Sequence, residues 1–128
     1  MDDRTWGRIC DEEAEKSDKI IDTICVGKEI LNTLIISPVA GVKMEKINTA
    51  LGGNKKIIRV MPNTPLMYSA GATAIAVGGD VSDEEKAFCE KIFASSGVTA
   101  FLPEEQIDTV SGISGSSPAF FMRFAREL

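Results

Sequence analysis

The 128 residues have the composition of a globular chain of about one domain, with 44% hydrophobic and 26% charged residues. Fourteen Lys and Arg against nineteen Asp and Glu give a net charge of −5, which argues against a nucleic-acid partner. The longest apolar runs are only a few residues, so we expect no membrane-spanning segment. The acidic first sixteen residues lack the apolar stretch of a signal peptide.

No histidine occurs in the sequence, which excludes a Ser-His-Asp triad and a Cys-His dyad and removes the commonest metal ligand. We therefore expect no metal site and nominate no catalytic side chain. Cys10, Cys25 and Cys89 are odd in number and form no C-x-x-C pair, which is typical of a reducing, cytoplasmic compartment and of buried thiols. Any chemistry must then come from elsewhere, such as a cofactor.

The first half of the chain predicts a strand–helix–strand unit. An acidic segment, 1–16, precedes a helix over 18–31. A strand over 34–36, a helix over 41–51 that stops at Gly52 and Gly53, and a strand over 56–61 follow. The two strands of such a unit are parallel.

The second half predicts a strand over 72–77, a helix with Ser82 and Glu85 as a capping box, and a strand over 98–102. Phe88, Ile92 and Phe93 are expected to form the buried side of that helix. Only ten residues separate Met61 from Ala72, too few for a helical crossover, so the second and third strands should be antiparallel. The sheet is then mixed.

A helical pattern begins after Pro103, with Ile107 and Val110, and is expected to break over 114–118. Ser117 as N-cap and Pro118 at the first helical position predict a new helix there. The stripe of this second helix comprises Phe120, Phe121, Phe124 and Leu128. Such a stripe is typical of a core or a subunit interface.

Two segments follow parallel strands, Ser37–Gly41 and Met61–Pro65, and the carboxyl ends of parallel strands border the ligand crevice of open α/β sheets. The alternative is that Gly41 and the prolines only shape turns. A third segment, 112–118, offers hydroxyls and backbone N–H groups for an anion, or else simply caps a helix. No G-x-G-x-x-G occurs in the sequence.

Four strings, over 36–42, 59–65, 71–74 and 110–120, closely resemble pyrroline-5-carboxylate reductase, in this order and spacing. The resemblance runs from about Leu34 to Leu128, and Ser37-Pro38 replaces the more usual small-residue pair of the family. It implies the central portion of the enzyme: residues 17–103 as an incomplete Rossmann-type NAD(P)-binding domain of the α/β class with a mixed, mainly parallel sheet, and residues 104–128 as the start of an all-α dimerisation domain.

The family reduces the C=N bond of 1-pyrroline-5-carboxylate to L-proline, the last step of proline synthesis, with NADPH or NADH. The resemblance places Ala40, Gly41 and Met61, Pro62, Asn63, Thr64, Pro65 beside the nicotinamide, and Ser114, Gly115, Ser116 and Ser117 near the substrate. It also implies a homo-oligomer. The alternatives are a non-catalytic fragment that acts as an association module, and a sibling dehydrogenase of another small acid.

Overall fold

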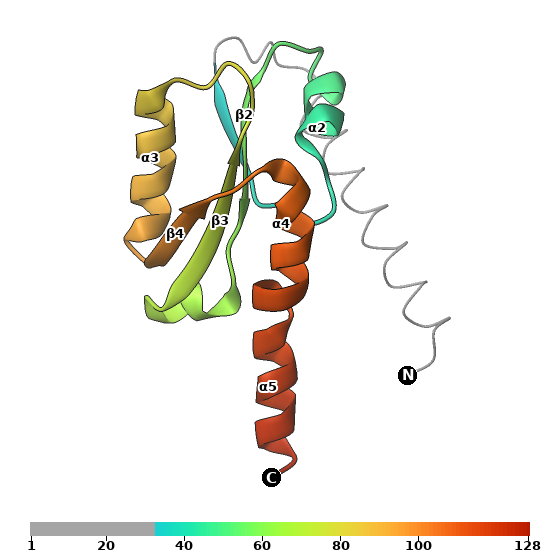
Figure 1. Ribbon diagram of the computed structural model, residues 1–128, viewed down its shortest axis with the longest axis vertical. Helices are drawn as coiled ribbons and strands as arrows, with labels where there is room; N and C mark the ends of the chain where they lie inside the picture. Colours follow the sequence, from blue (N-terminus) through green and yellow to red (C-terminus); the bar gives the residue numbers. More distant parts are fainter. Residues whose placement is uncertain (1–32) are drawn as a thin grey trace, which may run out of the picture.

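The computed structural model describes residues 33–128, so the helix expected over 18–31 and the acidic segment 1–16 lie outside the described residues. This part of the chain forms four strands and four α-helices (Figure 1). The elements are β1 (Leu34–Ser37), α2 (Met44–Ala50), β2 (Lys56–Met61), the 3₁₀ helix η1 (Thr64–Tyr68), β3 (Gly71–Val77), α3 (Asp83–Ala94), β4 (Gly97–Phe101), α4 (Glu104–Val110), the π-helical turn η2 (Ser111–Gly115) and α5 (Ser117–Arg126).

The strands form one mixed sheet in the order β1-β2-β3-β4. β1 and β2 are parallel, with Ser37 opposite Arg59, which confirms the predicted strand–helix–strand unit. β2 and β3 are antiparallel, with Met61 opposite Ala74, as the short connection between them requires. β3 and β4 are parallel, because α3 supplies the crossover. The fold is therefore of the α/β class with a mixed sheet, as the sequence predicts.

Helices cover both faces of the sheet, α3 on one side and α2 with α4 on the other (Figure 1). Under α3, the core contains Ile58, Val60, Ile75, Val81 and Cys89. The opposite face holds two apolar clusters. In one, Val42 and Ile47 pack on Ile57, and in the other, Ile107 packs on Met61, Ala74 and Ala76. β2 thus alternates its side chains between the two layers, as a central strand does.

The prediction that Phe88, Ile92 and Phe93 form the buried side of α3 is wrong for Phe88 and Ile92. Phe88 is 59% exposed and Ile92 is 44% exposed, whereas Cys89 is fully buried and Phe93 packs against the core. The pairs 88/92 and 89/93 lie about 100° apart around the helix, so only one of them can point squarely at the sheet. The pair that contains the smaller side chain, Cys89, takes that position.

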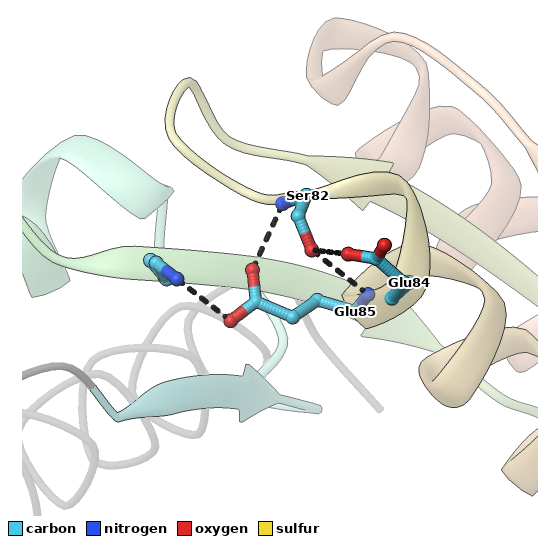
Figure 2. Close-up of polar contacts among 4 residues, drawn as sticks. Ser82, Glu84 and Glu85 are labelled. Atoms are coloured by element: carbon cyan, nitrogen blue, oxygen red, sulfur yellow. Dashed lines mark hydrogen bonds and ion pairs between the residues drawn. The ribbon is translucent and has the colours of Figure 1, made fainter.

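The predicted capping box at the start of α3 is confirmed (Figure 2). The backbone N–H of Glu85 donates to Ser82 Oγ (3.3 Å), and the N–H of Ser82 donates to Glu85 Oε2 (2.8 Å). Lys56 Nζ, at the start of β2, also donates to Glu85 Oε1 (2.9 Å). One carboxylate therefore caps α3 and ties it to the sheet.

The bond from Lys56, together with the N–H of Ser82, lowers the pKa of Glu85 below its ordinary value. A carboxylate of this kind stabilises the fold fully above its unfolded-state pKa, and the stabilisation is lost as pH falls through the folded-state pKa. We expect Glu85→Gln to lower the unfolding temperature at neutral pH, with the gap to the wild type closing toward about pH 3. Thermal unfolding followed by circular dichroism across this range tests the expectation, and a gap that persists in acid contradicts it.

The break expected over 114–118 is not a loop: the α-helix is interrupted there by the π-helical turn η2 and by one turn residue, Ser116. The chain runs from α4 through η2 into α5, and the N–H of Ser116 donates to the carbonyl of Ser111 (3.1 Å), a π-helical bond. Ser117 is consequently the first residue of α5 and not its N-cap, and Ser116 precedes it in helical conformation without a side-chain cap. Pro118 therefore lies in the first turn of α5, directly after the π-helical turn.

The described part of the chain contains no helix with both the length and the apolar character that crossing a membrane requires. The predicted division at residue 103 between two domains stays a prediction. Helix α4, which follows that position, packs on the sheet through Ile107.

Candidate functional site

The first candidate loop connects β1 to α2. Gly41 is exposed and has φ +73°, a left-handed conformation that suits glycine, and no atom lies within 4 Å of where its Cβ would be. Val42, the next residue, is buried against Ile57 and anchors the turn to the sheet. Ala40 and Gly41 therefore present exposed backbone that a flat group can approach closely.

The second candidate loop follows the neighbouring parallel strand, β2. Met61 is buried, and Asn63 leads into η1 with Pro65 in its first turn. Asn63 Oδ1 accepts a hydrogen bond from the N–H of Ala72 (2.9 Å), at the beginning of β3. This bond fixes the carboxamide in place. Within the described residues, its NH₂ group has no hydrogen-bond partner.

The third candidate segment, Ser114–Ser117, lies in η2 and at the start of α5. Ser114 Oγ donates to the carbonyl of Val110 (3.1 Å), and Ser116 Oγ donates to that of Ser111 (3.4 Å). The N–H groups of Ala119 and Phe120 donate to the carbonyl of Ser116. Of the N–H groups that we expected for anion binding at a helix N-terminus, that of Ser116 is not free, because it donates to the carbonyl of Ser111.

The second and third segments both lie beside Ala72. Its N–H is held by Asn63, and its side of the sheet lines a cavity of about 200 Å³ with Ala74, Val110 and Ser114. The first loop stands apart: Gly41 borders a separate open hollow of about 650 Å³ with Lys43, Lys46 and Thr49. Val42, beside the first loop, and Met61, in the second, pack on the same face of the sheet, the one that α2 and α4 cover.

An ion-pair network around one buried arginine was not anticipated from the sequence. Arg59, in β2, is fully buried, and its Nη2 lies 2.6 Å from Asp108 Oδ1 in α4. Its Nη1 lies 3.6 Å from Glu104 Oε1, which also accepts a hydrogen bond from the N–H of Met44 (2.6 Å). The sequence did carry a signal for this network: Arg59 is the single charge in the apolar strand 57–61, and a buried charge needs an oppositely charged partner.

The described residues include no group of three or more His, Cys, Asp or Glu arranged to hold a metal ion. Cys89 is a free thiol in the core, and burial raises its pKa, so it is poorly suited to act as a nucleophile. The three candidate segments offer backbone, hydroxyl and amide groups. Such groups can position ligands and exclude water but supply no acid or base near neutrality.

No protein-family model matches the chain. The chain is 40% identical to the pyrroline-5-carboxylate reductase of Escherichia coli (strain K12) over 93 residues, 73% of this chain and 35% of that protein. It is 41% identical to pyrroline-5-carboxylate reductase 1 of Bacillus subtilis (strain 168) over 88 residues, 69% of this chain and 30% of that protein. The chain thus spans about a third of the length of these curated relatives.

Solved structures give the same relationship. The 1-pyrroline-5-carboxylate reductase of Streptococcus pyogenes aligns with a TM-score of 0.73 at 29% identity, over 83% of this chain and 40% of that one. The pyrroline carboxylate reductase of Plasmodium falciparum with NADP bound aligns with a TM-score of 0.69 at 30% identity, over 75% of this chain and 38% of that one.

Fold and site together define an α/β protein with part of a Rossmann-type fold. The similarity to these relatives shows that the chain belongs to the pyrroline-5-carboxylate reductase family, and it corresponds to part of the length of those proteins.

Proposed function

We propose that this chain is the central part of an NAD(P)H-dependent reductase that converts 1-pyrroline-5-carboxylate to L-proline in proline biosynthesis. The observation that carries the proposal is that Ala72, near the end of β2, is bonded to Asn63 of the loop Met61–Pro65 and also shares a cavity with Ser114. In open α/β sheets the carboxyl ends of the parallel strands border the ligand crevice. The similarity to reductases of this name supports the same reading.

In this proposal, Ala40, Gly41 and Met61–Pro65 flank the nicotinamide half of the cofactor. The open space around Gly41 and the unpartnered NH₂ group of Asn63 fit a flat ring with a polar substituent. Ser114, Gly115, Ser116 and Ser117 face the substrate. The serine hydroxyl oxygens orient it as acceptors, without transferring a proton, because the hydroxyl hydrogens of Ser114 and Ser116 are already donated to helix carbonyls.

The cofactor supplies the hydride for the C=N carbon of the protonated imine. The role of the protein is to align the two rings and to exclude water, which needs no histidine. NADP in the Plasmodium falciparum relative supports NADPH as the cofactor, with NADH as the alternative. Cytoplasmic location is part of the proposal, supported by the free thiol of Cys89.

The 128 residues by themselves should bind NADPH weakly and show no appreciable turnover, because they contain no glycine fingerprint to hold the pyrophosphate. Nicotinamide fluorescence measures the binding, and absorbance at the nicotinamide band measures oxidation in the presence of 1-pyrroline-5-carboxylate. A complete absence of NADPH binding contradicts the proposed nicotinamide loops. Robust turnover contradicts the need for the fingerprint.

We also propose that the protein is a homo-oligomer that uses α5, whose large apolar side chains are exposed: Phe120, Phe121, Met122 and Phe124. Burying one such side chain contributes roughly 1.5 to 3 kcal/mol, so an exposed stripe favours self-association. Sedimentation at about 100 µM should show dimers or larger species for the wild type and monomers for Phe120→Ser/Phe124→Ser. Monomers in both cases would leave α5 without a role in assembly.

A further inference from the structure

We propose that Arg59 is a positioning residue: through its ion pairs it determines how the three candidate segments are placed relative to one another. The inference rests on the proposed function for the meaning of those segments. Its physical content is a buried guanidinium whose ion pairs connect β2, α4 and α2. Arg59 is fully buried, so its role toward a ligand is indirect.

The first connection joins the loop after β2 to the π-helical turn. Arg59 lies two residues before Met61, and Asp108 lies three residues before Ser111, where η2 begins. The 2.6 Å contact between Arg59 Nη2 and Asp108 Oδ1 therefore couples the strand that presents Met61–Pro65 to the helix that presents Ser114. A charged hydrogen bond of this length is strongly dependent on distance and direction.

The second connection reaches the turn at Gly41. Glu104 Oε1 is shared between Arg59 Nη1, at 3.6 Å, and the N–H of Met44, at 2.6 Å. Met44 is the first residue of α2 and lies three residues after Gly41. A shift of the guanidinium thus displaces the carboxylate that holds the start of α2, and with it the segment that carries Ala40 and Gly41.

Apolar packing alone would hold α4 less specifically. Beneath α4 the sheet offers Met61, Ala74 and Ala76, which pack with Ile107. Such contacts are non-directional and tolerate small slides of a helix. Within the described residues, Arg59 Nε and Nη1 are buried without hydrogen-bond partners, a cost that pure stability would not favour. Retaining a charge there is explained by a gain in precise placement.

A distance measurement in the whole 128-residue chain tests this role. Met67→Cys in η1 and Ile113→Cys in η2, at positions 77% and 66% exposed, accept spin labels in a Cys10→Ser/Cys25→Ser background, while the buried Cys89 stays unlabelled. Pulsed electron resonance then gives the distribution of distances between the two segments. Circular dichroism verifies that each variant is folded, and no catalytic turnover is needed.

We expect Arg59→Met to broaden this distribution and to shift its mean by about 2 Å or more, the scale of helix shifts at packed interfaces. Asp108→Asn keeps the side-chain shape and removes the charge, and it should give the same change to a smaller degree. Because Asp108 is partly exposed, this variant decides the question if Arg59→Met does not fold. Lys56→Met is the matched control, since it removes an ion pair from the other end of β2.

An unchanged distribution in the folded Arg59→Met or Asp108→Asn variant would overturn the inference and leave Arg59 with a purely stabilising role. An equal shift in Lys56→Met would overturn it too, because any loss of charge on β2 would then suffice. Failure of the proposed function would appear separately, as absence of NADPH binding by the unsubstituted chain.

Discussion

Gly97→Ala is expected to lower the free energy of unfolding by more than about 3 kcal/mol. Gly97 begins β4 opposite Gly71, with φ +153°, and a Cβ there would lie 2.0 Å from the carbonyl oxygen of Gly71. That atom belongs to the backbone of a paired strand, so relief of the overlap requires the two strands to separate. Urea denaturation gives the difference directly.

Gly79→Ala is the matched control for this variant. Gly79 is exposed, no atom lies within 4 Å of its added Cβ, and its φ is outside the range that favours glycine. We expect a change within about 0.5 kcal/mol. If Gly97→Ala were as mild as Gly79→Ala, the close β3–β4 approach at Gly71 would not exist in solution.

Asn63→Asp is expected to reduce kcat/KM by at least about tenfold, or 1.4 kcal/mol, in a chimera that joins residues 33–128 to the remaining segments of the Escherichia coli relative. The substitution keeps an oxygen for the N–H of Ala72 and removes the NH₂ group that we propose contacts the nicotinamide. Because the turn stays anchored, the unfolding temperature should change little. Steady-state kinetics and thermal unfolding of the same samples test both parts.

Asn63→Leu separates the two roles of this side chain. It removes the NH₂ group and also the oxygen that accepts from Ala72, so it should lose activity and, in addition, about 1 kcal/mol of stability. Full activity in Asn63→Asp would show that the NH₂ group is not used and would refute the nicotinamide assignment of Met61–Pro65.

Short-range patterns predicted most of the architecture. The strand–helix–strand unit and the end of α2 near Gly52 and Gly53, both with positive φ, follow from periodicity and glycine placement. The capping box of Ser82 and Glu85 depends on residues three apart. The antiparallel direction of β3 follows from a connection too short for a crossover. In each case the deciding residues are neighbours in the chain.

The start of a helix at Ser117 was predicted correctly, but the prediction that Ser117 is its N-cap was wrong. A Ser-Ser-Pro string is typical of a helix N-terminus. Here a π-helical turn precedes the proline, and Ser116 is in helical conformation with its N–H bonded to the carbonyl of Ser111. The string 112–118 by itself does not distinguish a side-chain cap from a π-helical turn, because either can precede a proline in the first turn of a helix.

The sequence by itself determined the order of the elements, the mixed direction of the strands and the loops at the strand ends, since these depend on spacing within short segments. Only the tertiary structure decided which side of α3 is buried, and which carboxylates meet Arg59, because Asp108 lies 49 residues further along the chain. Local propensity is settled by neighbouring residues. The partner of a buried charge is settled by how the layers pack, and this depends on the whole fold at once.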